Sequence, residues 1–339
     1  MPVEPMDAGA DSPESTSASA PAPDAPVTGV RCSSGHSFDR ARQGHLTLLG
    51  PRGRRFQGDT TDQVLARERV LGSGAFDPVV AMLAGIADDA TRSVADPVIV
   101  EAGAGTGFYL ARVLAELRAA SERIGHDGLD EHDGYDRLDG HAGHDGHAGQ
   151  GGHAGQGGLD EKDGLPAKAL AGTGPLGIGT EISVAAARRL AKCSTDVAAL
   201  VADTWDGLPL ADSSVNLVQV VFAPRNAAEF ARVLVPGGTL VVAGPGERHL
   251  EPLRTAAGML TPEAGKADRL EAGLAEYFTP GALHEVDTIV TVPGSIAVDL
   301  ALMGPSGVHL DRTDLEREFD GREQHVRLHV EARTFHPAI

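Results

Sequence analysis

Residues 98–109 constrain the fold of this chain more than any other part of its sequence. Three apolar residues lead into Glu101, and glycines follow at alternate positions, Gly103, Gly105 and Gly107. Apolar residues at helical spacing come directly after them: Leu110, Val113, Leu114 and Leu117. Glycine lets the main chain turn sharply and approach a ligand, and a helix start leaves N–H groups without intrahelical partners. The segment therefore predicts a strand–loop–helix unit that binds a nucleotide cofactor.

The glycine spacing and the preceding acid indicate which cofactor fits this loop. Dinucleotide-binding loops follow the pattern G-x-G-x-x-G, whereas the spacing here is G-x-G-x-G. The carboxylate of Glu101 would repel a pyrophosphate, but it suits the cationic methionine end and the hydroxyl groups of S-adenosylmethionine (SAM). We therefore expect a SAM site that includes Glu101, Gly103, Gly105, Thr106 and Gly107. A glycine-rich turn without a ligand is the alternative.

Composition limits where the protein functions. The chain has 339 residues, of which 41% are hydrophobic, enough for a sizeable core. Its only cysteines, Cys32 and Cys193, are too few for a disulfide scaffold. No apolar run reaches membrane-spanning length, and the N-terminus lacks the basic start and apolar block of a secretory signal. We expect a soluble, cytoplasmic protein that does not contact a membrane.

The net charge of −19 is unevenly distributed. Residues 1–30 contain five acidic and no basic side chains, and residues 121–172 contain eleven acidic and four basic ones. Residues 31–57, in contrast, contain six arginines and one aspartate. A basic patch on an acidic protein is typical of a phosphate-binding surface, although a solvated loop gives the same charge count.

Two segments have the composition of unstructured chain. Residues 1–30 are rich in Ala, Pro, Ser and Asp, so they cannot bury enough apolar surface to offset the entropy of ordering. The insert at 121–172 runs in triplets that mostly end in glycine, and it holds six of the fourteen histidines. Such a His/Gly/Asp-rich tract could bind Zn²⁺ or Ni²⁺ weakly, but we interpret it as a disordered surface loop.

Without that insert, strands and helices alternate along the chain. The expected strands are 98–101, 174–181, 197–203, 215–222, 239–243, 285–292 and 325–335. The expected helices are a helical region from about 62 to 86, then 184–192 and 227–234. The strand at 215–222 is almost entirely apolar, as in a strand buried on both faces. This order predicts an α/β, Rossmann-like fold with a mostly parallel sheet and ligands at the carboxyl ends of its strands.

Polar residues at two strand ends are further candidates for SAM binding. Glu181 ends the second expected strand, where its carboxylate can accept hydrogen bonds from both ribose hydroxyls. A helix N-cap or a surface acid is the alternative for this residue. Asp203, followed by Thr204, ends the third strand, where a carboxylate can accept a hydrogen bond from the adenine amino group. These residues complete the predicted cofactor site.

The end of the fourth strand is the candidate substrate pocket. It comprises Phe222, Pro224, Arg225 and Asn226. This position would overlook the reactive methyl group of SAM, so we expect these side chains to line the substrate site. A surface ion pair is the alternative for Arg225.

Residues 234–242, Leu-Val-Pro-Gly-Gly-Thr-Leu-Val-Val, resemble the segment after the catalytic strand and its helix in class I SAM-dependent methyltransferases. Four other segments resemble the guanine-N1 methyltransferases of 23S ribosomal RNA, the family that includes the tylosin-resistance methyltransferase. They are residues 32–49, residues 59–67 continuing to 71–78, residues 221–226, and residues 303–306 with His309. The resemblance covers nearly everything except the tail and the insert.

This resemblance implies transfer of a methyl group from SAM to N1 of a guanine in a 23S rRNA hairpin, and with it tylosin-like macrolide resistance as one role. It also implies two more SAM contacts, Phe76, which replaces the family's usual tyrosine, and His249. The guanine must be presented unpaired or flipped out, and its N1 proton must leave as the methyl group arrives. The sequence identifies no general base for that proton.

The zinc ligands are where the sequence departs from the family. The family's N-terminal module resembles a zinc ribbon with a C-x₂-C pair followed by a C-x₃-H pair. Cys32 and His36 match the second pair, but no cysteine precedes Cys32. Because a closed zinc site takes four protein ligands, we expect an incomplete site of which these residues are remnants. The expected organisation is a disordered tail at 1–30, a degraded, RNA-contacting zinc-ribbon-like module at 31–57 and a methyltransferase domain at 58–339.

Three other functions fit part of this pattern. The chain could be a small-molecule methyltransferase that has lost the RNA-binding zinc module, a SAM-binding protein without activity, or an NAD-dependent reductase. Asp39, Gly44 and the arginine-rich segment favour the rRNA methyltransferase. The oligomeric state stays open, and a dimer is compatible with the sequence.

Overall fold

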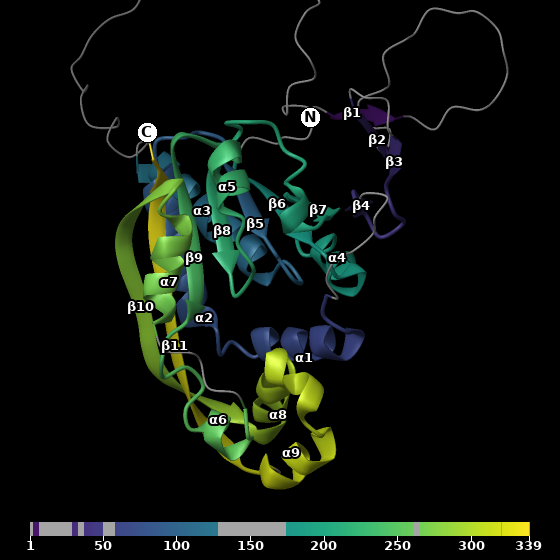
Figure 1. The fold of residues 1–339 in the computed structure, drawn as a ribbon, viewed down its shortest axis with the longest axis vertical. Helices are drawn as coiled ribbons and strands as arrows, with labels where there is room; N and C mark the ends of the chain where they lie inside the picture. The colour runs from purple at the N-terminus through teal and green to yellow at the C-terminus, as the bar shows by residue number, and fades with distance from the viewer. Residues whose placement is uncertain are drawn as a thin grey trace, which may run out of the picture.

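The computed structural model describes residues 3–6, 29–32, 37–49, 58–127, 174–259, 265–319 and 321–338. The chain forms an eight-stranded sheet with helices on both faces (Figure 1). The predictions for the rest of the tail, for His36 and for residues 128–172 of the insert lie outside these residues, as does the side chain of Cys32.

The strand order of the sheet is β10-β11-β9-β8-β5-β6-β7-β4. The strands are β4 (Leu46–Thr47), β5 (Val98–Ala102), β6 (Leu176–Glu181), β7 (Val197–Val201), β8 (Val215–Val221), β9 (Leu234–Pro245), β10 (Phe278–Pro293) and β11 (Glu323–Pro337). Neighbours from β4 to β9 pair in parallel, whereas β11 is antiparallel to both β9 and β10. The predicted α/β fold with a mostly parallel sheet is therefore confirmed.

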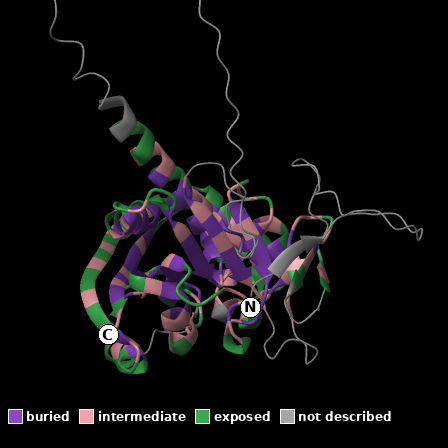
Figure 2. Ribbon diagram, turned by 90° about the horizontal axis from the view of Figure 1, so that it is seen from above, coloured by how far each residue is buried: buried purple, intermediate pink, exposed green. Residues whose placement is uncertain are grey.

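The order of the strands reverses between β5 and β8. From β5 the chain adds β6 and β7 on one side, then crosses over to add β8 and β9 on the other. In an open α/β sheet, the carboxyl ends of strands at such a reversal leave a crevice that binds ligands. Both strands are buried on both faces, and Ile99, Val100, Leu217 and Val218 are fully inaccessible (Figure 2). This rigid centre fixes the positions of the loops that leave β5 and β8.

The helices form a layer on each face of the sheet. Their bounds are α1 (Thr61–Gly72), α2 (Asp77–Thr91), α3 (Phe108–Asp127), α4 (Val184–Leu190), α5 (Ala227–Val233), α6 (Leu253–Ala256), α7 (Lys266–Leu274), α8 (Gly294–Leu302) and α9 (Arg312–Phe319), with 3₁₀ turns η2 (Thr204–Asp206) and η3 (Pro305–His309). Helices α2, α3 and α4 contribute to one apolar cluster, and α5 and α7 to another. Helices α8 and α9 pack together beside α1, below the sheet in Figure 1.

The helical region expected at 62–86 is two helices, with an angle of 82° between them. Thr60 and Gln63 form a capping box at the start of α1. The chain turns at Gly74, whose φ of +83° favours glycine, and α2 then begins with a proline in its first turn. This break buries the ring of Phe76 at the junction of the two helices.

Several element boundaries differ from the sequence predictions. Helix α3 continues to Asp127, so the insert begins later than residue 121. Strand β7 ends at Val201, because Asp203 caps η2 instead. Strands β9 and β10 begin earlier than expected, at Leu234 and Phe278. Hydrogen bonding to β11 accounts for most of the added length of β10, since the two strands pair along almost their whole length.

A second, three-stranded sheet lies in the N-terminal segment. Strand β2 (Gly29–Cys32) pairs antiparallel with both β1 (Val3–Met6) and β3 (Ser37–Asp39). Residues 3–6, part of the tail at 1–30 that the sequence predicts to be disordered, form β1 in this sheet. Strand β4 joins this segment to the main sheet, because Leu46 and Thr47 pair with β7.

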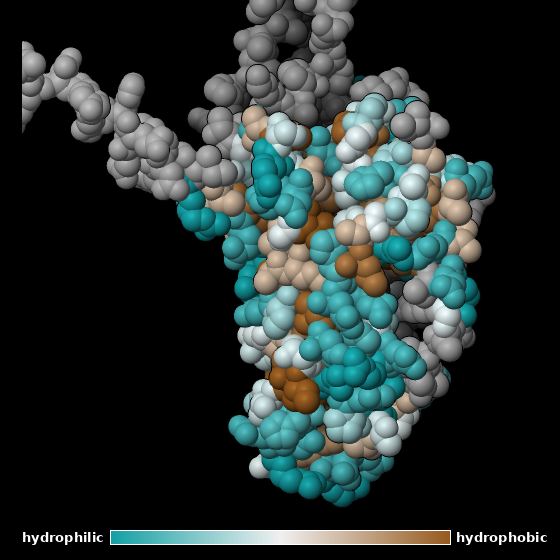
Figure 3. Space-filling view, turned by 90° about the vertical axis from the view of Figure 1, so that its left-hand side faces the viewer, coloured by the Kyte–Doolittle hydropathy of each residue, from teal (hydrophilic) through white to brown (hydrophobic). Residues whose placement is uncertain are grey.

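Strand β10 is one of the two edge strands of the large sheet. Leu283 and Ile289 are exposed there, with the exposed acids Glu285 and Asp287 between them. The face on this side is largely hydrophilic, with separate hydrophobic patches (Figure 3). Charges on an edge strand disfavour pairing with a further strand.

None of the described helices is by itself long and apolar enough to span a membrane. The bent pair of α1 and α2 meets the length and composition test only when the two helices are counted together.

Candidate active site

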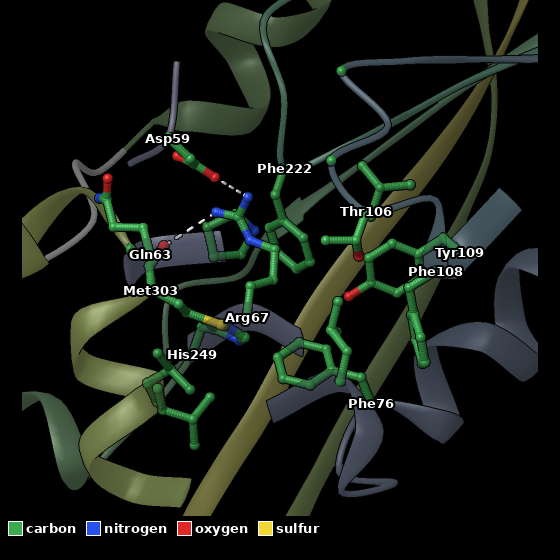
Figure 4. A pocket seen from close by; sticks show the side chains of 18 of the residues that line it. Asp59, Gln63, Arg67, Phe76, Thr106, Phe108, Tyr109, Phe222, His249 and Met303 are labelled. Atoms are coloured by element: carbon green, nitrogen blue, oxygen red, sulfur yellow. Dashed lines mark hydrogen bonds and ion pairs between the residues drawn. The ribbon is translucent and has the colours of Figure 1, made fainter. Parts of the chain in front are cut away.

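A cavity of about 860 Å³ opens where β5 and β8 end, at the reversal of strand order. Its lining comes from α1, the glycine loop, the start of α3, the ends of β8 and β9, and the α8–η3 turn. Among its lining residues are Asp59, Gln63, Arg67, Phe76, Glu101, Gly103, Gly105, Thr106, Phe108, Tyr109, Phe222, Arg225, His249, Arg254 and Met303. Figure 4 shows the rings of Phe76, Phe222 and Tyr109 around this space, with Arg67 opposite them.

The three glycines of the loop have different roles. All three have positive φ, +72° at Gly103, +56° at Gly105 and +82° at Gly107. A Cβ on Gly103 would lie 2.6 Å from the Cβ of Ala223, and one on Gly107 would lie 2.6 Å from the Sγ of Cys193. A Cβ on Gly105 would meet only the Nη1 of Arg67, at 3.8 Å. Gly103 and Gly107 therefore allow close packing, whereas Gly105 leaves room in the cavity.

Glu181 holds the glycine loop in place. Its Oε2 accepts a hydrogen bond of 2.9 Å from the main-chain N–H of Gly105, and its Oε1 accepts one of 2.7 Å from Ser183. Ser183, not Glu181, caps helix α4. Burial raises the pKa of the Glu181 carboxyl, partly offset by these two hydrogen bonds. The residue is thus neither a helix cap nor a surface acid.

Glu101 is an acid in the cavity lining for which the described part of the chain provides no cationic partner. Its side chain is 1% exposed and accepts a 3.0 Å hydrogen bond from Nε2 of Gln219, its neighbour on β8. Burial raises its pKa to about 8, and the nearby Glu181 carboxylate adds to the shift. A cation that binds beside this carboxyl would lower its pKa again and favour the ionised form.

Asp203 presents an acceptor that the fold does not use. Its Oδ1 accepts a 3.0 Å hydrogen bond from the N–H of Trp205, while its buried Oδ2 has no hydrogen-bond partner among the described residues. Buried polar atoms are rarely left unpaired, so this oxygen fits a ligand donor such as the adenine amino group of SAM. Asn226 donates a 2.9 Å hydrogen bond to the carbonyl of Thr204, which ties the end of β8 to the end of β7.

Phe222 presents an aromatic ring to the cavity from a strained position. Its φ is +53°, in the left-handed region that side chains rarely adopt, and it is 42% exposed. Its ring centroid lies 6.3 Å from that of Phe76, 6.4 Å from that of Tyr109 and 5.8 Å from that of His249. Such strain in a well-packed protein is typical of functional positions.

The wall opposite the glycine loop is built by α1 and the α8–η3 turn. Arg67 forms an ion pair with Asp59 and donates a 3.1 Å hydrogen bond to the carbonyl of Met303 (Figure 4). The main-chain carbonyl of Asp59 in turn accepts a 2.9 Å hydrogen bond from the hydroxyl of Ser183. These contacts join two of the segments that resemble rRNA methyltransferases, although they are more than 230 residues apart in sequence.

The structure brings together eight of the predicted site residues in one cavity: Phe76, Glu101, Gly103, Gly105, Thr106, Phe222, Arg225 and His249. The predicted residues outside its lining are Gly107, Glu181, Asp203, Thr204, Pro224 and Asn226. Glu181 still contacts the loop, and Asp203 and Thr204 lie at the end of the neighbouring strand β7. The sequence predictions missed Arg67, Tyr109 and Met303; the first and last lie in segments whose resemblance was noted but to which no role was given.

The incomplete zinc site stays a prediction, because His36 and the side chain of Cys32 lie outside the described residues. Within them, one cluster, Glu285, His329 and Glu331, has the spacing of a metal site. Nδ1 of His329, however, accepts a 3.0 Å hydrogen bond from the N–H of Arg248, so the ring proton is on Nε2. Nε2 lies 2.8 Å from Oε1 of Glu285 and 3.5 Å from Oε1 of Glu331, within ion-pair distance, but it has no hydrogen-bond partner among the described residues.

The strand order, the glycine loop and the acids at the ends of β5, β6 and β7 define a class I SAM-dependent methyltransferase. No family model matches the sequence. The chain is 33% identical over 288 residues to the 23S rRNA (guanine(748)-N(1))-methyltransferase of Streptomyces fradiae, covering 85% of this chain and 83% of that protein. It is 32% identical over 299 residues to a protein of Micromonospora griseorubida named as a 23S rRNA guanine-N1 methyltransferase, with coverages of 85% and 82%. The chain belongs to the 23S rRNA guanine-N1 methyltransferase family.

Solved structures resemble this fold at lower identity. A methyltransferase of Haloferax volcanii in complex with the activator Trm112 is 15% identical and covers 84% of this chain and 100% of its own, with a TM-score of 0.40. A methyltransferase of Bacillus halodurans is 12% identical, with coverages of 71% and 93% and a TM-score of 0.38.

Proposed function

We propose that this protein transfers the methyl group of SAM to N1 of a single guanine in 23S rRNA, at the position equivalent to guanine 748. The observation that carries the proposal is the 33% identity to the Streptomyces fradiae enzyme named for that guanine, over 85% of the chain. The cavity supports it, since the unpaired carboxyl of Glu101 in its lining suits a cationic cofactor, while aromatic rings and arginines line other parts of it.

Each part of SAM has a matching group in this proposal. Glu101 faces the cationic methionine end, the Glu181 carboxylate accepts from the ribose hydroxyls, and Oδ2 of Asp203 accepts from the adenine amino group. Phe76 and His249 form the apolar wall beside them. The cofactor supplies an electrophilic methyl group, and the protein residues hold the two reactants in line and exclude water.

The guanine enters from the side of Phe222. A base in a hairpin loop is unstacked or flipped out at low cost, and an exposed aromatic ring gives it a surface to stack on. The described part of the basic segment supports binding of a hairpin, because Arg31, Arg40 and Arg42 are all exposed there. Arginines in this position bind phosphates without regard to sequence, with an affinity that falls as salt rises.

The test is methylation of a transcript of the 23S rRNA hairpin by the purified protein. We expect one methyl group per transcript and a reverse-transcription stop one nucleotide before the target guanine. A transcript with adenine at that position is the control and should accept no methyl group. Transfer to both transcripts, or SAM binding with transfer to neither, would refute the proposal and favour a small-molecule methyltransferase. Resistance of a sensitive host to tylosin on expression of the gene would add the biological role.

A further inference from the structure

Arg225 is a half-buried arginine in the cavity for which the described residues provide no hydrogen-bond or ion-pair partner. The other arginines of the cavity differ in this respect. Arg67 pairs with Asp59, and Arg254 donates to the carbonyl of His249 and pairs with Glu251. Burial lowers the pKa of Arg225, and no carboxylate in the described part of the chain offsets the loss of hydration. A cation that is partly removed from water without a counter-charge points to a ligand with acceptor atoms.

The loop that carries Arg225 is fixed at both ends. The N–H of Phe222 donates a 3.0 Å hydrogen bond to the carbonyl of Ala243 on β9, and the side-chain amide of Asn226 holds the carbonyl of Thr204. Between them, Ala223 packs against Gly103 of the glycine loop. These contacts fix the main chain at Arg225 relative to the glycine loop, so its side chain extends from a preorganised position.

The chemistry of guanine identifies the acceptor atoms. When N1 loses its proton, the negative charge spreads to O6, and O6 and N7 lie side by side in the base plane. A guanidinium group donates to these two atoms in a bidentate manner and leaves the N1 edge free. Contact at O6 would stabilise the deprotonated base, in the way that donors in an oxyanion hole stabilise a developing charge.

We propose that Arg225 is a catalytic residue that binds O6 and N7 of the target guanine and stabilises the charge on O6 as N1 is deprotonated. The inference rests on the proposed function. The N1–H bond breaks and leaves its electron pair on the base, and the proton passes to water. N1 then forms a bond to the methyl carbon as the carbon–sulfur bond breaks, and that electron pair stays on sulfur. Charge and atoms balance without a further reactant.

The experiment compares single-turnover methyl transfer to the hairpin at saturating RNA, between pH 6 and pH 10, for the wild type, Arg225→Gln and Arg225→Lys. The control is Arg92→Gln, which removes an exposed arginine that pairs within α2 only. We expect Arg225→Gln to lower the rate at pH 7 by about 100-fold and to recover at high pH, where hydroxide deprotonates the base. Arg225→Lys should be intermediate, and the control unchanged.

Methyl transfer to a modified hairpin distinguishes a contact of Arg225 with the guanine base from a contact with a phosphate. Replacing the target by 7-deazaguanine removes the N7 acceptor, so it should slow the wild type but leave Arg225→Gln unaffected. A rate loss that does not depend on pH and that disappears at low salt would mean that Arg225 binds a phosphate, and would overturn the proposal.

Calorimetry and thermal melting exclude indirect effects. The affinity for SAM and the Tm should stay within error of the wild type; a loss of SAM binding in Arg225→Gln would place the residue in the cofactor site and overturn the proposal. If the wild type itself transfers no methyl group to the hairpin, the proposed function fails and this inference fails with it. If the wild type is active and Arg225→Gln matches it at every pH, only the inference fails.

Discussion

The two sides of the cavity differ in charge and in how they are built. On the side of β5, β6 and β7 the buried Glu101 lines the cavity, and Glu181 and Asp203 lie at the ends of the next two strands, outside the lining. Each of these acids is hydrogen-bonded to the protein. The side formed by α1, the end of β8 and the α8–η3 turn presents aromatic rings and the arginines Arg67 and Arg225. In the proposed reaction a cation and a polyanion come together, and this arrangement would give each of them a separate side of the cavity.

Gly105→Val, on the proposed cofactor side of the cavity, should have the largest effect of the variants. A side chain here projects into the cavity, so SAM binding should fall by about 100-fold or more, which calorimetry measures. The matched control is Gly237→Val on β9, where φ is also positive, +79°, and no atom lies within 4 Å of an added Cβ. Both variants share a strain of about 1–2 kcal/mol. Equal SAM affinity in the two variants would contradict the assignment of the loop.

Phe222→Ala tests the substrate side. Loss of a stacking surface should lower the catalytic efficiency with the RNA hairpin by about 10- to 100-fold, because a base–aromatic stack contributes about 1–3 kcal/mol. SAM affinity should change by less than about threefold, since no predicted cofactor contact is removed. Phe222→Tyr is the control and should keep most of the activity. If SAM affinity falls in Phe222→Ala by as large a factor as the catalytic efficiency, Phe222 contacts the cofactor instead of the RNA.

The residues on one side of the cavity could be predicted from the sequence better than those on the other side. The cofactor side follows from local patterns: a strand ends, an acid or a glycine loop follows, and parallel strands bring these ends to one edge. Glu101, Glu181 and Asp203 could be predicted in that way to lie at neighbouring strand ends. The wall opposite depends on contacts between distant segments, such as that of Arg67 with Met303, and no local spacing predicts them.

The burial of Phe76 and the backbone conformation of Phe222 could not be predicted from local sequence patterns. The break between α1 and α2 that buries Phe76 lies inside a continuous helical pattern, and only Gly74 and Pro78 mark it. The positive φ of Phe222 follows no residue preference, since the fold imposes it. Pro224 and Asn226 were expected to line the substrate pocket on the same grounds, but neither is part of the cavity lining.

Glu101→Gln should change the number of protons released when SAM binds, which is a smaller effect than those of the two variants above. Because the pKa of Glu101 is about 8 in the folded, ligand-free protein, the stability that this residue contributes should fall as pH rises from about 4.5 to about 8. A bound cation reverses the shift, so SAM binding at pH 7 should release close to one proton. Calorimetry in buffers of different ionisation enthalpy measures this number, and Glu101→Gln should reduce it to near zero. Proton release that is unchanged in the variant would exclude Glu101 as its source.

Removal of residues 130–170 should have the smallest effect of all. Helix α3 begins beside the cavity at Phe108 and spans 20 residues, so its end at Asp127 is about 30 Å away from the site. The chain rejoins the sheet at Leu176, the start of β6, which is the end of that strand opposite to Glu181. Both attachment points are thus at the amino-terminal ends of the parallel strands, whereas the cavity is at their carboxyl ends. We expect SAM affinity and Tm to stay nearly unchanged in a deletion closed by a short Gly/Ser linker, with the full chain measured alongside. A deletion protein that still binds SAM but no longer methylates the hairpin would show that this tract belongs to the RNA side of the comparison.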